Sequence, residues 1–322
     1  MTIQVVSNHS GVYLVNEYQK NMALSLRGNG KSIRKIAKEL GVPKSTLWDF
    51  YAREQLLKPS SGGSRLLFLD VEVSPTIAAC FGRYNTSISP KHVLREPYML
   101  TYAYAKTIDG GVSVSSLTDY PLFNDDHRDD SMLISGLQKL LDESDIVIAH
   151  NAGFDVGWFN QRCLYWGIPI PSPYKVVCTL KSIRKAFSLP ANSLEAAANY
   201  FNLPRKLDNS GIQLWIDCYY GCTEAFDQMA DYNVGDIITL RALYKAVLPY
   251  TKSHPNMSLY YEDTNMRCNK CGSDHLVQTD NKHYTGSAMY TVYSCGSCGS
   301  NVTFRNNLLE KDKRKSLARG TL

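Results

Sequence analysis

The run Leu66-Leu67-Phe68-Leu69-Asp70-Val71-Glu72-Val73 decides how the rest of the chain is interpreted. Its apolar, partly β-branched composition predicts a buried strand. Because side chains alternate between the two faces of a strand, Asp70 and Glu72 should project from the same face. Two neighbouring carboxylates repel each other and raise each other's pKa unless a cation intervenes. The run therefore predicts a bound divalent metal and, with it, phosphate chemistry.

Two further acidic motifs follow along the chain. The first is His150-Asn151-Ala152-Gly153-Phe154-Asp155, which comes directly after the apolar run Ile146–Ala149 and places Asp155 at the start of a helix. The second is Tyr232-Asn233-Val234-Gly235-Asp236, in which the tyrosine and the last aspartate are four residues apart. Residues at that spacing share one face of a helix, so Tyr232 and Asp236 can point at the same site.

The order of the predicted elements indicates the fold class. Extended runs at 98–106 and 112–117 follow the first strand, and a helix at 131–141 precedes the apolar run Ile146–Ala149. Further helices are predicted at 156–166, 180–186, 193–201, 223–232 and 234–248. Antiparallel strands followed by alternating strands and helices describe an α/β protein with a ribonuclease-H-like mixed sheet and flanking helices.

The three motifs, in this order, resemble those of the DEDD superfamily of 3′→5′ exonucleases. The patterns are Asp-x-Glu, Asn-x-x-Phe-Asp and Tyr-x-x-x-Asp, and they span roughly residues 66–250. The histidine subgroup would need a histidine five residues before Asp236, but position 231 is aspartate, so the chain resembles the tyrosine subgroup. The stretches 70–75, 85–88 and 211–215 are similar to those of phage and prophage exonucleases. Cys178 stands where an aspartate is more usual, and it is not one of the four carboxylates.

The resemblance implies a role for each catalytic residue. Asp70 would bridge two Mg²⁺ or Mn²⁺ ions, and Glu72 and Asp236 would complete the ion that carries the attacking water. Asp155 would hold the second ion, and the Tyr232 hydroxyl would orient the water. Two such ions stabilise the entering and leaving oxygens of phosphodiester hydrolysis. By the same resemblance, Arg205 and Lys206 would lie near the 3′-terminal nucleotide, although both are also ordinary surface charges.

Four of the nine cysteines form a second constellation. The pairs Cys268-x-x-Cys271 and Cys295-x-x-Cys298 are each followed by glycine, which permits the positive φ of a knuckle turn. Four thiolates bind one structural Zn²⁺ tetrahedrally, so residues 262–305 are predicted to form a zinc ribbon with a hairpin between 276–278 and 289–293. A redox dithiol is the alternative. Tyrosines in the hairpin either stack on bases or form the ribbon's own core.

The N-terminal segment, residues 1–58, is predicted to be a homeodomain-like helix-turn-helix. Ser32 begins a short amphipathic helix that Gly41 ends, and a second helix starts near Lys44. That helix would present Lys44, Ser45, Thr46 and Arg53 to a DNA groove. A protein-docking domain built from three short helices is the alternative.

Charge and composition complete the prediction. The net charge is +6 over residues 1–65, −4 over 66–252 and +3 over 253–322, which suits polyanion binding at both ends and metal binding in the middle. A Gly- and Ser-rich linker at 58–64 precedes the exonuclease domain at 65–252, and a basic tail covers 306–322. The absence of a long apolar run predicts no membrane span, and the N-terminus does not read as a secretory signal.

These observations predict a cytoplasmic 3′→5′ DNA exonuclease (in the host cytoplasm if phage-encoded). Its partners would be single-stranded DNA or recessed 3′ ends and a replication or recombination protein, with no membrane and no nucleotide cofactor. Two alternatives stay open at this point. One is an exoribonuclease of the same chemistry, because recognition of the 2′-hydroxyl depends on a pocket that the sequence does not reveal. The other is a non-catalytic DNA-binding regulator or scaffold.

Overall fold

The computed structural model describes residues 17–28, 31–44, 46–47, 50, 63–82, 87–204 and 211–318. The helices are α1 Glu17–Gly28, α2 Ile33–Leu40, α4 Ser131–Asp142, α5 Gly153–Trp166, α6 Thr179–Ala186, α7 Leu194–Tyr200, α8 Ile212–Tyr219, α9 Thr223–Val247 and α10 Lys311–Lys315. The strands are β1 Leu66–Val73, β2 Ile77–Ala78, β3 Val93–Arg95, β4 Met99–Ala105, β5 Ser113–Ser116, β6 Ile146–Ala149, β7 Lys175–Cys178, β8 Leu276–Tyr284, β9 Met289–Cys295 and β10 Asn301–Thr303.

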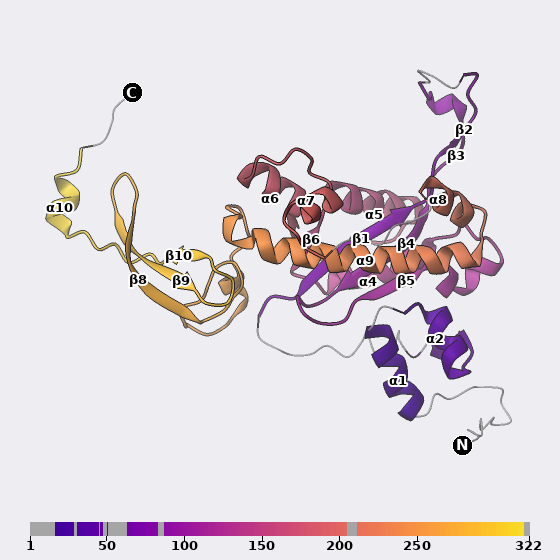
Figure 1. Ribbon diagram of the computed structural model, residues 1–322, viewed down its shortest axis with the longest axis horizontal. Coiled ribbons are helices and arrows are strands. Elements are labelled where there is room, and N and C mark those ends of the chain that lie inside the picture. The colour runs from indigo at the N-terminus through magenta and orange to yellow at the C-terminus, as the bar shows by residue number, and fades with distance from the viewer. Residues whose placement is uncertain are drawn as a thin grey trace.

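A five-stranded mixed sheet with flanking helices lies at the centre (Figure 1). The strand order is β5-β4-β1-β6-β7; β1, β4 and β5 pair antiparallel, whereas β6 and β7 run parallel to β1. The last two strands are parallel because each connection crosses over through a helix. This arrangement is compatible with a ribonuclease-H-like fold.

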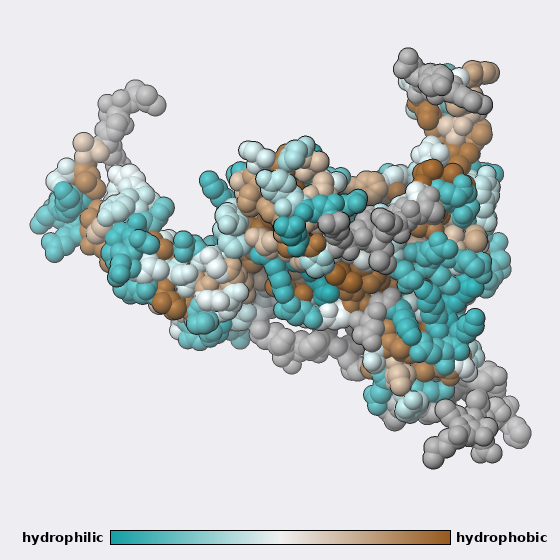
Figure 2. All heavy atoms as spheres, in the orientation of Figure 1, coloured by the Kyte–Doolittle hydropathy of each residue, from teal (hydrophilic) through white to brown (hydrophobic). Residues whose placement is uncertain are grey.

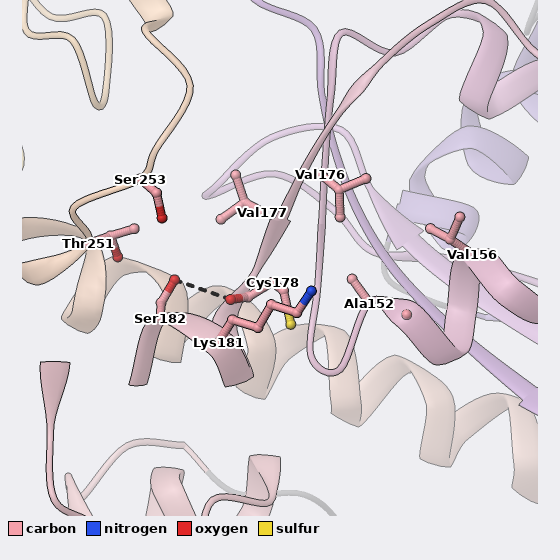
Figure 3. Close-up of a pocket in the computed structure, with 10 residues that line it drawn as sticks. Ala152, Val156, Val176, Val177, Cys178, Lys181, Ser182, Thr251 and Ser253 are labelled. Carbon is pink, nitrogen blue, oxygen red and sulfur yellow. Dashed lines mark hydrogen bonds between the residues drawn. The ribbon is translucent and has the colours of Figure 1, made fainter. Parts of the chain in front are cut away.

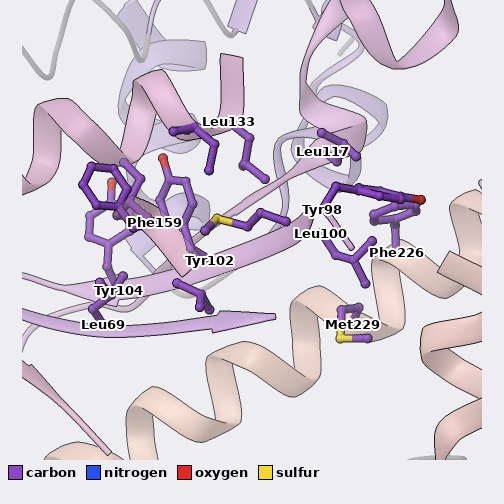
Figure 4. Packing of buried hydrophobic residues seen from close by; sticks show 14 of the residues in the cluster. Leu69, Tyr98, Leu100, Tyr102, Tyr104, Leu117, Leu133, Phe159, Phe226 and Met229 are labelled. Carbon is purple, nitrogen blue, oxygen red and sulfur yellow. The ribbon is translucent and has the colours of Figure 1, made fainter. Parts of the chain in front are cut away.

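The two faces of β1 are buried by different helices. Leu67, Leu69 and Val71 point into a large apolar cluster that includes side chains of α4 and α5, such as Leu133 and Phe159 (Figure 4). Phe68 points to the opposite face, where it belongs to a second cluster with residues of α9. The Phe68 and Tyr244 rings meet edge to face, with centroids 5.3 Å apart. Asp70 and Glu72 follow Phe68 at two-residue steps, so the pleat turns both toward α9.

The long helix α9 differs from the two helices predicted at 223–232 and 234–248. It is continuous over Thr223–Val247 and packs across β4, β1 and β5. Gly235 lies inside it and is buried, so this glycine does not end the helix. The sequence prediction also omitted α8, the edge strand β7 and the β2–β3 arm, which projects from the sheet above α8 (Figure 1).

Helix α2 has the predicted caps, and the N-terminal helices share a small apolar core. The Ser32 hydroxyl accepts a hydrogen bond from the Lys35 amide, and Gly41 ends α2 in the left-handed region at φ 62°. Their apolar cluster consists of Ala23, Leu26, Ile33, Ile36, Ala37, Val42, Leu47 and Phe50.

The C-terminal sheet has the order β10-β9-β8 and includes the predicted hairpin. It meets the end of α9 through Lys270, whose Nζ donates to the carbonyl oxygens of Leu248 (3.2 Å) and Pro249 (2.7 Å). An ammonium at the carbonyl end of a helix complements the helix dipole, so this contact ties the cysteine region to α9.

Candidate metal centres

Three carboxylates meet where β1 passes under α9. Asp70 and Glu72 pair with Ala103 and Thr101 of β4, and their oxygens lie within 4.8 Å of each other and of an oxygen of Asp236. Asp236 comes from α9 and is buried, whereas Asp70 and Glu72 are half-buried. The shared face expected for the carboxylates of β1 is therefore present, and α9 adds the third group.

Asn233 and Trp215 fix the orientation of two of these carboxylates. The Asn233 Nδ2 donates to Asp70 Oδ2 at 2.6 Å, and its own Oδ1 accepts a hydrogen bond from the Thr101 hydroxyl at 3.1 Å. Trp215 Nε1 donates to Glu72 Oε2 at 3.1 Å. Each bond engages one carboxylate oxygen and aims the side chain, as outer-sphere partners do at metal sites.

Sequence reasoning did not assign a role to either residue. Asn233 stands inside the Tyr-x-x-x-Asp motif, at the helical position next to the tyrosine, and Trp215 lies in a stretch quoted only for resemblance. Asn233 lies three residues before Asp236 and therefore shares one face of the helix with it. A polar side chain on that face was the signal that could have identified Asn233. Trp215 gave no signal, because α8 was not predicted.

Tyr232 lies on α9 one turn before Asp236 and is 8% exposed. Its ring meets the Trp215 indole edge to face, with centroids 5.4 Å apart. Trp215 therefore contacts both Tyr232 and Glu72, and it connects the tyrosine to the carboxylate group.

Asp155 stands apart from the three-carboxylate group. It lies in the first turn of α5, is 2% exposed, and its Oδ1 accepts a hydrogen bond from the Val71 amide at 3.1 Å. Val71 separates Asp70 from Glu72, so Asp155 reaches the same part of β1. Its Oδ2 is buried without a hydrogen-bond partner among the described residues. Burial raises the pKa of Asp155 to about 7.

The residues around Asp155 have structural roles. Asn151 adopts a left-handed conformation (φ 61°) at the turn into α5. The imidazole of His150 is held between the Thr179 hydroxyl (2.9 Å) and the Asn192 carbonyl (3.0 Å). A carbonyl only accepts, so Nε2 carries the proton, and burial lowers the His150 pKa. His150 is thus a packed residue at the strand end.

The donor set fits a hard divalent cation. Ligand oxygens around one octahedral Mg²⁺ lie about 3 to 4 Å apart, comparable with the spacing of the Asp70, Glu72 and Asp236 oxygens. The orphaned Oδ2 of Asp155 is a buried polar atom that needs a partner, and a cation would supply one. These residues can therefore bind a divalent metal ion.

The four paired cysteines form a second candidate centre. The Sγ atoms of Cys268, Cys271, Cys295 and Cys298 lie within 4.8 Å of one another, with Cys271–Cys295 at 3.5 Å and Cys268–Cys298 at 3.7 Å. A tetrahedral ion with metal–sulfur bonds of about 2.3 Å has sulfur–sulfur edges of about 3.8 Å. Disulfide sulfurs would be about 2 Å apart. The spacing therefore suits a tetrahedral metal and excludes a disulfide here.

Both knuckle turns have the backbone that the glycines were predicted to allow. Gly272 and Gly299 have φ of 77° and 72°, and their amides donate to the carbonyls of Cys268 and Cys295. A hydrogen bond from Cys271 lowers the pKa of the Cys268 thiol, which favours its thiolate form. The aromatic residues divide: Tyr293 and Phe304 pack in the core of this sheet, whereas Tyr284 is 69% exposed.

The residues predicted to contact nucleic acid are only partly described. Lys44 and Thr46 are half-buried where an open groove-binding face was expected. The charges of Asp119 and Asp227 in the central region counteract the lowering of the Lys44 pKa by burial. Ser45, Arg53, Arg205 and Lys206 lie outside the described residues.

A cavity of about 280 Å³ opens between α5 and α6, beside the edge strand β7 (Figure 3). Its lining includes Val156, Val177, Cys178, Lys181 and Thr251. None of the four predicted catalytic carboxylates lines it.

Comparisons with known proteins place few constraints on this chain. No family model matches the chain, and a search of curated proteins finds no match. Among solved structures, the Mos1 strand transfer complex is 11% identical, with a TM-score of 0.18 over 77% of this chain and 82% of that chain. A TM-score this low does not show that the two chains share a fold. Within the described residues, no helix is long and apolar enough to cross a membrane.

Proposed function

We propose that this protein is a metal-dependent 3′→5′ DNA exonuclease that releases nucleoside 5′-monophosphates. The observation that carries the proposal is the meeting of Asp70, Glu72 and Asp236 on one face of the sheet, with Tyr232 on the same helix as Asp236. These side chains gather from two distant segments, and hydrogen bonds orient Asp70 and Glu72, which indicates a built site more than a chance acidic patch.

Each residue has a distinct role in this proposal. Asp70, Glu72 and Asp236 would hold one divalent ion, and Asp155 would contribute to a second through its buried Oδ2. When bound, Mg²⁺ or Mn²⁺ supplies a nucleophile at neutral pH and stabilises charge on the phosphate oxygens. Tyr232 would orient the attacking water through its hydroxyl. Trp215 would hold the Tyr232 ring and the Glu72 carboxylate in fixed positions relative to each other.

The flanking regions are proposed as accessory modules around an exonuclease domain at residues 65–252. Residues 1–58 would form a DNA-binding helix-turn-helix, and residues 262–305 a ribbon around one structural Zn²⁺, followed by a basic tail at 306–322. The sulfur–sulfur distances support the zinc proposal. The zinc proposal is tested by measuring the metal content of the purified protein, and we expect one zinc ion per chain.

The exonuclease proposal is tested with 3′-labelled single-stranded DNA, purified protein and Mn²⁺. We expect stepwise shortening to mononucleotides, and no shortening by the Asp70→Ala variant. A matched control is Glu195→Ala, which removes an exposed carboxylate on α7 and should leave the rate unchanged. Full activity of Asp70→Ala would contradict the proposal. Faster shortening of an RNA of matched sequence would instead identify RNA as the preferred substrate.

A further inference from the structure

The basic N-terminal helices face acidic side chains of the central region. Among the described residues, four ion pairs cross this boundary, and all of their cations come from the N-terminal side. They join Arg27 to Asp119 (Nη2–Oδ2, 4.0 Å), Arg34 to Glu224 (Nη2–Oε1, 3.6 Å), Arg34 to Asp227 (Nη1–Oδ2, 3.9 Å) and Lys35 to Asp231 (Nζ–Oδ2, 2.7 Å).

The acidic partners on α9 form a stripe of their own. Glu224, Asp227 and Asp231 are spaced three and four residues apart, so they lie along one side of the helix. Asp231 is the immediate neighbour of Tyr232, but the helix turns by about 100° per residue and directs the two side chains differently. We call Glu224, Asp227 and Asp231 the acidic stripe. Hydrophilic side chains gather on both sides of the boundary between α2 and the central region (Figure 2).

A more deeply buried contact lies beside the stripe. Asp119 is 1% exposed and its Oδ2 accepts a hydrogen bond from the Ser116 amide. Arg27 approaches that carboxylate, and its side chain is 11% exposed. Lys44 lies close by; burial lowers its pKa, while the charges of Asp119 and Asp227 oppose that change. The lysine expected to meet phosphates is thus influenced by carboxylate charges of its own chain.

We propose that the cationic surface of the N-terminal helices (Arg27, Arg34, Lys35 and Lys44) has two alternative occupants, the acidic stripe with Asp119 and the phosphate backbone of duplex DNA. Binding of DNA then requires release of the helices from α9. The same nitrogen atoms cannot hold both anions at once, and partly exposed ion pairs are weak and easily screened. Duplex DNA offers a far denser row of negative charge than these four carboxylates do.

The inference rests on the DNA-binding part of the proposed function and not on catalysis. Its test therefore uses the full chain, with its zinc, in buffer without added Mg²⁺ or Mn²⁺, so that the duplex stays intact. A zero-length carbodiimide cross-link between Lys35 and Asp231 reports the docked state, because their side chains are in direct contact. Lys106–Glu143 within the central region and Lys31–Glu39 within the N-terminal helices are internal control pairs.

We expect saturating duplex DNA to lower the Lys35–Asp231 cross-link several-fold and to leave both control cross-links unchanged. A constant Lys35–Asp231 yield with DNA bound would overturn the inference, as would a failure of the chain to bind duplex DNA at all. Nuclease activity in Mn²⁺, measured separately, keeps the fate of the catalytic proposal distinct.

A second measurement uses the double variant Glu224→Gln/Asp227→Asn. Without the competing carboxylates a larger fraction of the chain is available for DNA, so the affinity should rise about three- to tenfold. The control variant Glu195→Gln/Glu262→Gln removes the same number of charges at exposed sites on other elements. Equal gains in DNA affinity in the two double variants would mean that the gain comes from net charge alone, which would contradict the inference.

Discussion

Replacing Trp215 with phenylalanine removes one hydrogen bond from the carboxylate group and keeps an aromatic ring against Tyr232. The lost bond joins the indole Nε1 to Glu72 Oε2 at 3.1 Å. A hydrogen bond to a charged group contributes about 1.5–3 kcal/mol. About 1.4 kcal/mol corresponds to a factor of ten in affinity. Loss of the bond that orients Glu72 should therefore weaken metal binding about 10- to 100-fold.

The assay is the Mn²⁺ concentration that gives half of the maximal rate on labelled single-stranded DNA. We expect this midpoint to rise about 10- to 100-fold in Trp215→Phe. The free energy of unfolding should change little, because Glu72 is half-buried and water can replace the lost donor. An unchanged midpoint together with an unchanged rate would refute the positioning role of Trp215.

Trp166→Phe is the matched control, because Trp166 Nε1 also donates to a carboxylate, Asp130 Oδ1, at 2.6 Å. Asp130 is completely buried and is not in the carboxylate group of the metal site. This variant should lose about 1.5–3 kcal/mol of stability while its Mn²⁺ midpoint stays constant. The two tryptophan variants therefore separate positioning of the metal ligands from stabilisation of the fold.

Three other outcomes follow from the same structure. Arg162→Ala should cost about 3–5 kcal/mol in urea unfolding, because it leaves the buried Asp130 carboxylate without its bidentate partner. Asn233→Ala should reduce the rate at limiting Mn²⁺ about 10- to 100-fold by releasing Asp70, whereas saturating Mn²⁺ should restore part of it; no dependence on Mn²⁺ would contradict this. Removal of zinc by a chelator, or Cys268→Ser, should abolish hydrogen-exchange protection in β8 and β9, and retention of that protection would contradict a structural metal.

Much of the central fold could be predicted from the sequence because its signals are local. The strand containing Asp70 begins and ends at the predicted residues, and the apolar run before His150 is a strand in the sheet. The Ser32 cap and the Gly41 stop depend on hydrogen bonds within a few residues, so they too were predictable.

The parts that were missed depend on contacts between distant segments. Strand β7 is four residues long and owes its place to pairing with β6, which no local pattern reveals. The role of Trp215 arises from its contact with Glu72, a residue 143 positions away. The charge asymmetry was interpreted only as polyanion binding, because sequence alone could not show that the basic helices face the acidic stripe.

Helix α9 imposes a phase relation on the whole protein. It carries the acidic stripe near its start and Asp236 in its middle, and Lys270 binds the carbonyls just past its end. One residue inserted between Asp236 and Leu248 would turn everything beyond it by about 100° around the helix axis. An insertion of seven residues, about two turns, would nearly restore the angle. Insertions in this helix should therefore be tolerated only when they add close to whole turns. In a library of one- to seven-residue insertions, nuclease activity should be lost with one residue and should return with seven.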